Sequence, residues 1–216
     1  SLSDDRARQV ARDVGAGLVL TGRAAADQGR IILTSALLSA SDGSVVARVE
    51  PVSVARDSLL AAADRVTAEL LVRASGEPLG RLPALREERI EVLRTYLAGR
   101  LAYVRGQTAL AIARFSEAAA ADSGFPYAPL GLSLVRGLEA DDSAARAMRG
   151  RLSPADQLFL TALASVRYPD PAPEADVVRV WEDAVQHGAG YPESWFKLSE
   201  ELFHRGPLIG MPRVLN

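Results

Sequence analysis

The sequence predicts an α+β domain over residues 1–75, a linker over 76–84 and an all-α helical solenoid over 85–216. Strand-type and helical patterns alternate in the first part, whereas the last part is helical throughout. The segment ASGEPLGRLP at 74–83 holds two glycines and two prolines, which is typical of a loop. A chain of 216 residues has room for two such domains.

A helix is expected to open the first part, followed by strands in an antiparallel arrangement. Ser3 is a capping residue, and two aspartates follow it in the first helical turn, where carboxylates suit the helix dipole. Strand-type segments come next, at 18–22, 30–39 and 45–50. An apolar stripe at helical spacing predicts a second helix over 57–73.

Two turns connect the predicted strands. Asp27 and Gly29 mark the first of them. The dipeptide Asp42-Gly43 is the stronger hairpin signal and predicts a type I′ turn, because that turn requires positive φ angles. Three strands and two helices make a thin core, so we expect a further strand before Ser1.

Glycine, proline or a capping residue separates the helices predicted in the second part. Ser153, followed by Pro154 and Asp156, is the clearest start signal, since it combines an N-cap with proline at the first helical position. The predicted helices span 85–105, 108–121, 126–138, 141–150, 154–167, 174–187 and 192–205.

The helices repeat with a period in the thirties, which is a solenoid signal. In the first copy, small residues at Gly99, Ala111 and Ala118 surround the large Phe115, and Gly131 follows Gly99 after 32 positions. This spacing resembles the tetratricopeptide repeat. Further copies are marked by Tyr127, Leu130, Gly131 and Leu134, by Phe159, Leu160, Leu163, Trp181 and Ala184, and by Trp195, Leu198, Ser199, Leu202 and Gly206. The resemblance implies about 3.5 helix pairs that stack, because one repeat cannot bury its own apolar face.

The first part resembles the α/β domain related to the TolB amino-terminal domain. The matching segments are Gly15-Ala16, the strand Val19 to Gly22, and Asp42-Gly43. Followed by tetratricopeptide-like helices, this arrangement is similar to C-terminal regions of bacterial serine/threonine protein kinases, and of some adenylate cyclases and transcriptional regulators. The resemblance implies a sensor or docking region outside the cytoplasm, with a cytoplasmic location as the alternative. The kinase motifs themselves do not occur in this sequence.

Composition argues against several function classes. A net charge of −2 provides no basic field for nucleic acid, and no apolar run is long enough to span a membrane. Without cysteine there is no thiolate nucleophile and no cysteine-ligated metal. The two histidines, His187 and His204, lack a metal-binding spacing. We therefore expect no catalytic residues, no metal and no cofactor in this chain.

A peptide-binding groove is the candidate site. The tetratricopeptide resemblance places extended peptides on the concave face, which the first helix of each pair lines. Its spacing selects Tyr96, Arg100, Tyr103, Leu132, Arg136, Phe196, Glu200 and His204. The arginines would bind a carboxylate or backbone carbonyls, and the aromatic rings would add apolar contact. In the alternative, the aromatic residues Tyr96, Tyr103 and Phe196 pack between stacked helices.

Two functions stay open at this point. The first is a non-catalytic sensor or scaffold region that binds a protein or peptide partner through the concave surface. The second is a small-molecule sensor with its ligand at the junction of the two parts, near Glu77 to Leu85, because such junctions are common ligand sites. Pairing of two copies through residues 192–216 is a further expectation, since the last helix of an array exposes an apolar face.

Overall fold

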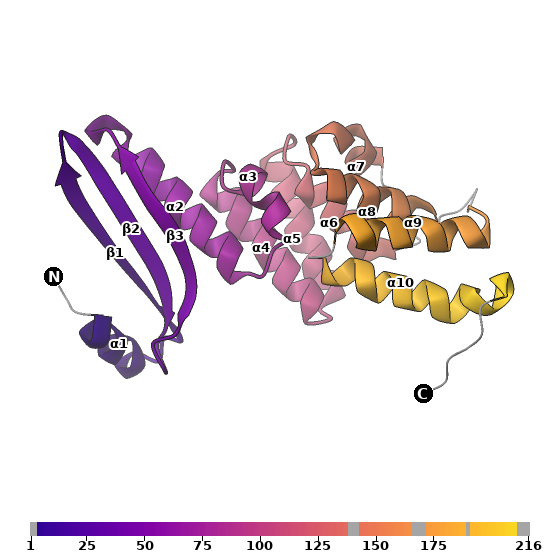
Figure 1. The fold of residues 1–216 in the computed structure, drawn as a ribbon, viewed down its shortest axis with the longest axis horizontal. Coiled ribbons are helices and arrows are strands. Elements are labelled where there is room, and N and C mark those ends of the chain that lie inside the picture. Colours follow the sequence, from indigo (N-terminus) through magenta and orange to yellow (C-terminus); the bar gives the residue numbers. More distant parts are fainter. Residues whose placement is uncertain (1–3, 138–142, 166–171, 189–190, 211–216) are drawn as a thin grey trace. The chain divides into compact units, whose positions relative to one another are not determined.

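The computed structural model describes residues 4–137, 143–165, 172–188 and 191–210. The chain divides into two compact units, Ser1–Ile90 and Glu91–Asn216. The first unit contains a three-stranded antiparallel sheet, and the second is helical (Figure 1). This confirms an α+β region followed by helices. Across the described residues, no helix is both long and apolar enough to cross a membrane.

The sheet of the first unit is a meander in the order β1-β2-β3. Successive side chains of a strand point to opposite faces of the sheet. One face of this sheet packs against the second helix, and the other packs against the first helix. Ala47 and Val49 pack with Val66 and Leu70 of the second helix, while Val19 packs with Ala11 and Ala40 on the other face. The elements are α1 (Asp4–Asp13), β1 (Leu18–Asp27), β2 (Arg30–Ser39), β3 (Val45–Val54) and α2 (Leu59–Ala74).

Strands β1 and β3 are both longer than the sequence pattern predicts. β1 continues through three alanines to Asp27, and Ala24 pairs with Leu33 of β2 in unbroken register. Alanine has little preference for strands, so pairing with β2 decides the conformation here.

The type I′ turn lies at Gln28-Gly29 and not at Asp42-Gly43. Gln28 has φ 44° and Gly29 has φ 80°, and the flanking residues Asp27 and Arg30 are paired, which leaves a two-residue loop. The connection between β2 and β3 is longer and spans residues 40–44, where only Gly43 has a positive φ.

Asp42 organises the longer connection through its side chain. Its carboxylate accepts hydrogen bonds from the Ser44 backbone N–H at 3.0 Å and from the Ser44 hydroxyl at 2.8 Å. Aspartate commonly binds the backbone two residues on in this way, so the same residue that signals a tight turn also suits a wider one.

The predicted linker is partly folded. Within 76–84 lie the 3₁₀ helix Leu79–Arg81 and the start of α3 (Leu82–Leu85). Glu77 and Arg81 form a buried ion pair at 2.9 Å. The segment belongs to the first unit, whose boundary falls later, after Ile90.

The predicted helices of the second unit are present, with ends that differ by a few residues. They are α4 (Ile90–Val104), α5 (Thr108–Ala121), α6 (Tyr127–Arg136), α7 (Ser143–Ala147), α8 (Pro154–Ser165), α9 (Glu174–His187) and α10 (Pro192–Arg205). The start of α8 is capped as expected, since the Asp156 backbone N–H donates to the Ser153 hydroxyl at 3.2 Å. The helices predicted at 126–138, 141–150 and 154–167 each extend in part outside the described residues.

The ring of Phe115 fills the space between three helices. A Cβ atom built on Gly99 of α4 would lie 2.8 Å from this ring, and one built on Gly131 of α6 would lie equally close. Phe115 is fully buried, and Tyr96, 5.7 Å away between ring centroids, extends the aromatic core. The small residues selected by the repeat spacing therefore do allow a large residue to pack between helices.

Alanine at Gly99 or Gly131 should destabilise the second unit. Overpacking costs about 1–3 kcal/mol, and the higher helix propensity of alanine returns up to about 1 kcal/mol. We expect urea unfolding to show a net loss of about 1–2 kcal/mol for each variant. Gly150→Ala is the matched control, because no heavy atom lies within 4 Å of its Cβ position. Equal stability of all three variants would contradict the packing described for Phe115.

The carboxyl group of Asp42 should titrate unusually low. Hydrogen bonds from Ser44 and Ser39 lower its pKa from 3.8 to about 2. Because the folded pKa lies below the unfolded one, the hairpin gains stability above pH 3.8 and loses it as the pH falls toward 2. Carboxyl-carbon NMR should give a midpoint near 2, and Ser44→Ala should raise it. Ser53→Ala, a change in β3 that leaves the Asp42 hydrogen bonds intact, should leave the midpoint unchanged.

Candidate functional site

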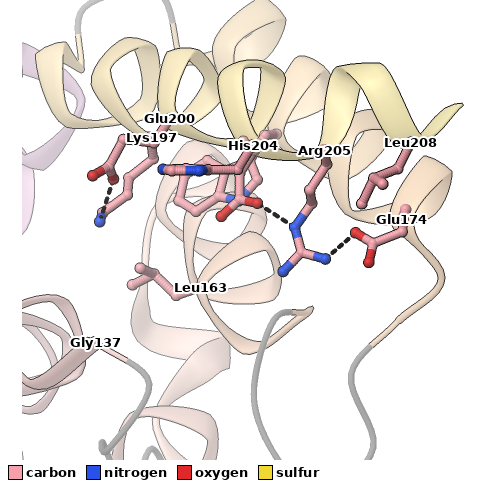
Figure 2. A pocket seen from close by; sticks show the side chains of 10 residues that line it. Gly137, Leu163, Glu174, Lys197, Glu200, His204, Arg205 and Leu208 are labelled. Atoms are coloured by element: carbon pink, nitrogen blue, oxygen red, sulfur yellow. Dashed lines mark hydrogen bonds and ion pairs between the residues drawn. The ribbon is translucent and has the colours of Figure 1, made fainter. Parts of the chain in front are cut away.

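A pocket of about 400 Å³ lies along α10 in the second unit (Figure 2). We call it the α10 pocket. Helix α10 contributes five of its residues, and α8, α9, the end of α6 and the turn after α10 contribute the others. The lining residues are Gly137, Leu163, Glu174, Trp181, Lys197, Glu200, Glu201, His204, Arg205 and Leu208.

Helical periodicity places the α10 residues of the pocket on one face. Lys197 is followed by Glu200 and Glu201 after one turn, and by His204 and Arg205 after two. Leu198 is buried, as a core position of the same helix should be. α10 is therefore amphipathic, with a charged face that borders the pocket.

The beginning of α10 is fixed by a polar contact with the start of α8. The Tyr191 hydroxyl, just before α10, donates to the Asp156 carboxylate at 3.1 Å, and Ser153 donates to the same carboxylate oxygen at 2.6 Å. Asp156 is completely buried. A buried carboxylate must be hydrogen-bonded to be tolerated, so these contacts define where α10 begins.

Ion pairs rim the pocket (Figure 2). Arg205 binds Glu201 of its own helix at 2.5 Å and also binds Glu174, the first residue of α9. Burial lowers the pKa of Arg205, but the hydrogen bonds that Arg205 donates to Glu174 and Glu201 outweigh that effect and raise the pKa above its ordinary value. Lys197 binds Glu200 at 2.7 Å. Three carboxylates thus face two cations.

Trp181 forms part of the pocket wall from α9. The residue is 1% exposed, and its ring packs edge-on against Phe159 at 5.7 Å between centroids. Its indole Nε1–H is buried and has no acceptor among the described residues. Leu163 of α8 is also buried. Part of the wall is therefore apolar, with one hydrogen-bond donor whose bonding capacity is unused.

A second polar contact joins α4 to the beginning of α10. Arg100 binds Glu193, and each side chain is only 12% exposed. The Arg100 guanidinium carbon lies 5.9 Å from the centre of the Tyr103 ring. Burial raises the pKa of Tyr103, and the charges of Glu193 and Glu200 raise it further, while Arg100 lowers it. These residues therefore share one electrostatic environment.

The structure brings together four of the eight residues selected by the repeat spacing. Arg100, Tyr103 and Glu200 interact electrostatically, and Glu200 and His204 line the α10 pocket. Arg100, for which the repeat spacing predicts ligand binding, binds Glu193 through its guanidinium group in this structure.

The other four selected residues lie elsewhere. Tyr96 is 1% exposed within the aromatic core, so it packs between helices as the alternative interpretation held. Phe196 is 58% exposed on α10, with the Lys197 ammonium group 5.7 Å from its ring centre. Leu132 is half-buried in α6, and Arg136 is exposed beside the pocket residue Gly137.

Sequence reasoning missed Glu174, Trp181, Lys197 and Arg205. The first two lie on α9, which the repeat assigns as the second helix of a pair, whereas the concave face of a tetratricopeptide array is lined by first helices. The spacing of Lys197 with Glu200, and of Glu201 with Arg205, signals a charged helical face. This charge pattern identifies Lys197 and Arg205 from the sequence.

The segment near Glu77 to Leu85, where the second function would place a small-molecule ligand, contains two charged side chains. They are Glu77 and Arg81, which are buried and bind each other. Among the described residues, no cluster of three His, Asp or Glu side chains is arranged to hold a metal ion. Comparison of the chain with protein-family models and with curated protein sequences finds no match.

Loss of the Arg205 side-chain charge should loosen the pocket. Arg205→Gln breaks the contacts of α10 with Glu174 and Glu201, and we expect it to lower the free energy of unfolding by about 1 kcal/mol, less at high salt. Arg179→Gln is the matched control, because Arg179 is 69% exposed and, among the residues with described positions, pairs with Asp176 of its own helix. The Arg179→Gln change should lower the free energy of unfolding by only about 0–0.5 kcal/mol. Equal costs in chemical denaturation would contradict a structural role for the Arg205 contacts.

Proposed function

We propose that this chain is a non-catalytic interaction module that binds a peptide segment of a protein partner in the α10 pocket. The observation that carries the proposal is one cavity of about 400 Å³ that combines buried apolar walls at Leu163 and Trp181 with charged rim groups. Binding pockets typically occupy about 300–1,000 Å³ and join apolar surface to a few oriented polar groups. A pocket at the lower end of that range suits one or two side chains of a peptide.

The chemistry of the rim favours recognition over catalysis. General acid–base catalysis needs a carboxyl group or histidine poised to exchange a proton with a substrate. Here Glu174, Glu200 and Glu201 are all engaged by Arg205 or Lys197, which keeps their negative charges in fixed positions. The histidine of the lining, His204, packs edge-on against the Phe203 ring. Fixed charges orient a ligand and set its register.

The surrounding helices support the same role. Glycine positions around Phe115 follow the tetratricopeptide spacing, and such arrays present grooves to peptides. The resemblance of both parts to kinase-linked regions supports a sensor or scaffold role in a bacterial signalling protein. In that role the peptide partner would come from another component of the signalling system.

A displayed library of random peptides, selected on the immobilised chain, tests the proposal. We expect enriched peptides whose affinity falls at least tenfold for Glu200→Arg, because this change reverses a charge at the pocket rim. Glu182→Arg on α9 is the matched control, since Glu182 is exposed and is not a lining residue. It should bind the selected peptides like the unchanged chain.

Two results would count against the proposal. If no peptide is enriched, or if both charge reversals leave binding unchanged, the α10 pocket is not a peptide site. Circular dichroism of both variants distinguishes a lost contact from a lost fold.

A further inference from the structure

We infer that the α10 pocket takes a basic side chain, so that its peptide ligand carries an arginine or lysine at the central position. The inference rests on the proposed function and specifies its ligand class. Three properties of the pocket support it: the excess of carboxylates, the apolar wall and the unused hydrogen-bond donor of Trp181.

The first supporting property is the excess of carboxylates at the pocket rim. Among the described lining residues, Glu174, Glu200 and Glu201 face Lys197 and Arg205, which leaves one negative charge in excess with His204 counted as neutral. The Glu174 and Glu200 side chains are 42% and 40% exposed, so a ligand can reach their oxygens. A carboxylate has about four acceptor positions, and one bound cation leaves several unused. An anionic ligand would instead have to break the existing pairs of Lys197 and Arg205.

The second supporting property is the apolar character of the pocket walls. Arginine and lysine carry three or four methylene groups before the charged end, and they bury this stem along apolar surface while the charge stays at the rim. In the α10 pocket, Leu163 and Trp181 are buried wall residues, and Leu208 adds an exposed apolar side chain. Apolar walls beneath an acidic rim match such an amphipathic side chain better than they match a wholly apolar or a wholly polar one.

The third supporting property is the indole N–H group of Trp181, and it does not depend on charge. A buried donor without an acceptor costs about 1–3 kcal/mol. Within the part of the chain that the structure describes, the Trp181 Nε1–H is such a donor, and Trp181 lines the pocket. Because the Nε1 atom is itself buried, a peptide carbonyl next to the basic residue supplies the acceptor only when the side chains that cover this atom move aside on binding. The ligand would then satisfy a buried polar group and neutralise the excess charge in a single binding event.

The two tryptophans of the chain allow a direct test by NMR. Trp181 and Trp195 each give one indole N–H signal, and Trp195→Phe assigns them. The probe is N-acetyl-arginine-N′-methylamide, and its neutral control is the citrulline analogue, which keeps the shape and loses the charge. We expect a saturable shift of the Trp181 signal with arginine, and at least fivefold weaker binding of the citrulline analogue.

Two variants establish which groups recognise the charge. Glu174→Gln combined with Glu200→Gln should weaken binding of the arginine probe at least fivefold. Glu182→Gln combined with Glu117→Gln removes the same charge from exposed glutamates that do not line the pocket, and it should leave binding unchanged. Equal binding of arginine and citrulline probes, absence of binding, or a shift confined to Trp195 overturns the inference.

The outcomes separate this inference from the proposed function. Pocket-dependent peptides that lack a basic residue would keep the peptide-binding function and overturn the ligand class. Binding of the arginine probe without any enriched peptide would keep the ligand class and overturn the peptide-binding function.

Discussion

The position of α10 depends on polar contacts at both of its ends, and the pocket exists because these contacts hold. At the beginning of the helix, Tyr191 binds the buried Asp156 carboxylate, and Glu193 binds Arg100 of α4. At the other end, Arg205 binds Glu174 of α9. Apolar packing alone is non-directional, so these oriented contacts determine where α10 lies against its neighbours.

The core beneath the helices follows a different rule, which is the matching of small and large residues. Gly99 and Gly131 allow α4 and α6 to approach the Phe115 ring, because neither carries a Cβ atom. The repeat spacing predicts this arrangement, since residues at fixed spacing on a helix share a face. Local pattern also predicts the start of α8, where Ser153 caps the helix as its residue type requires.

Sequence reasoning reaches less far where the partner of a residue is distant in the chain. Arg100 and Glu193 are 93 positions apart, and the sequence offers each of them several other oppositely charged residues as possible partners. The type I′ turn shows a related limit. Gln28-Gly29 lacks the typical Asn-Gly or Asp-Gly signal, yet unbroken pairing of β1 with β2 leaves only these two residues for the turn. In both cases tertiary contacts decide what local preference leaves open.

Helix α10 presents two different surfaces to solvent, and their physical properties differ in a way that bears on ligand recognition. Trp195, Phe196 and Phe203 are each more than half exposed, which gives one side of the helix exposed apolar area. The pocket face carries the ion-paired side chains of Lys197, Glu200, Glu201 and Arg205. Phe196 lies where the two surfaces meet, because the Lys197 ammonium group sits 5.7 Å from its ring and also binds Glu200 of the pocket rim. In the proposed function, a peptide held in the pocket by a basic residue would have this aromatic surface directly beside it for its neighbouring side chains, so that charge would set the register and apolar contact would add affinity.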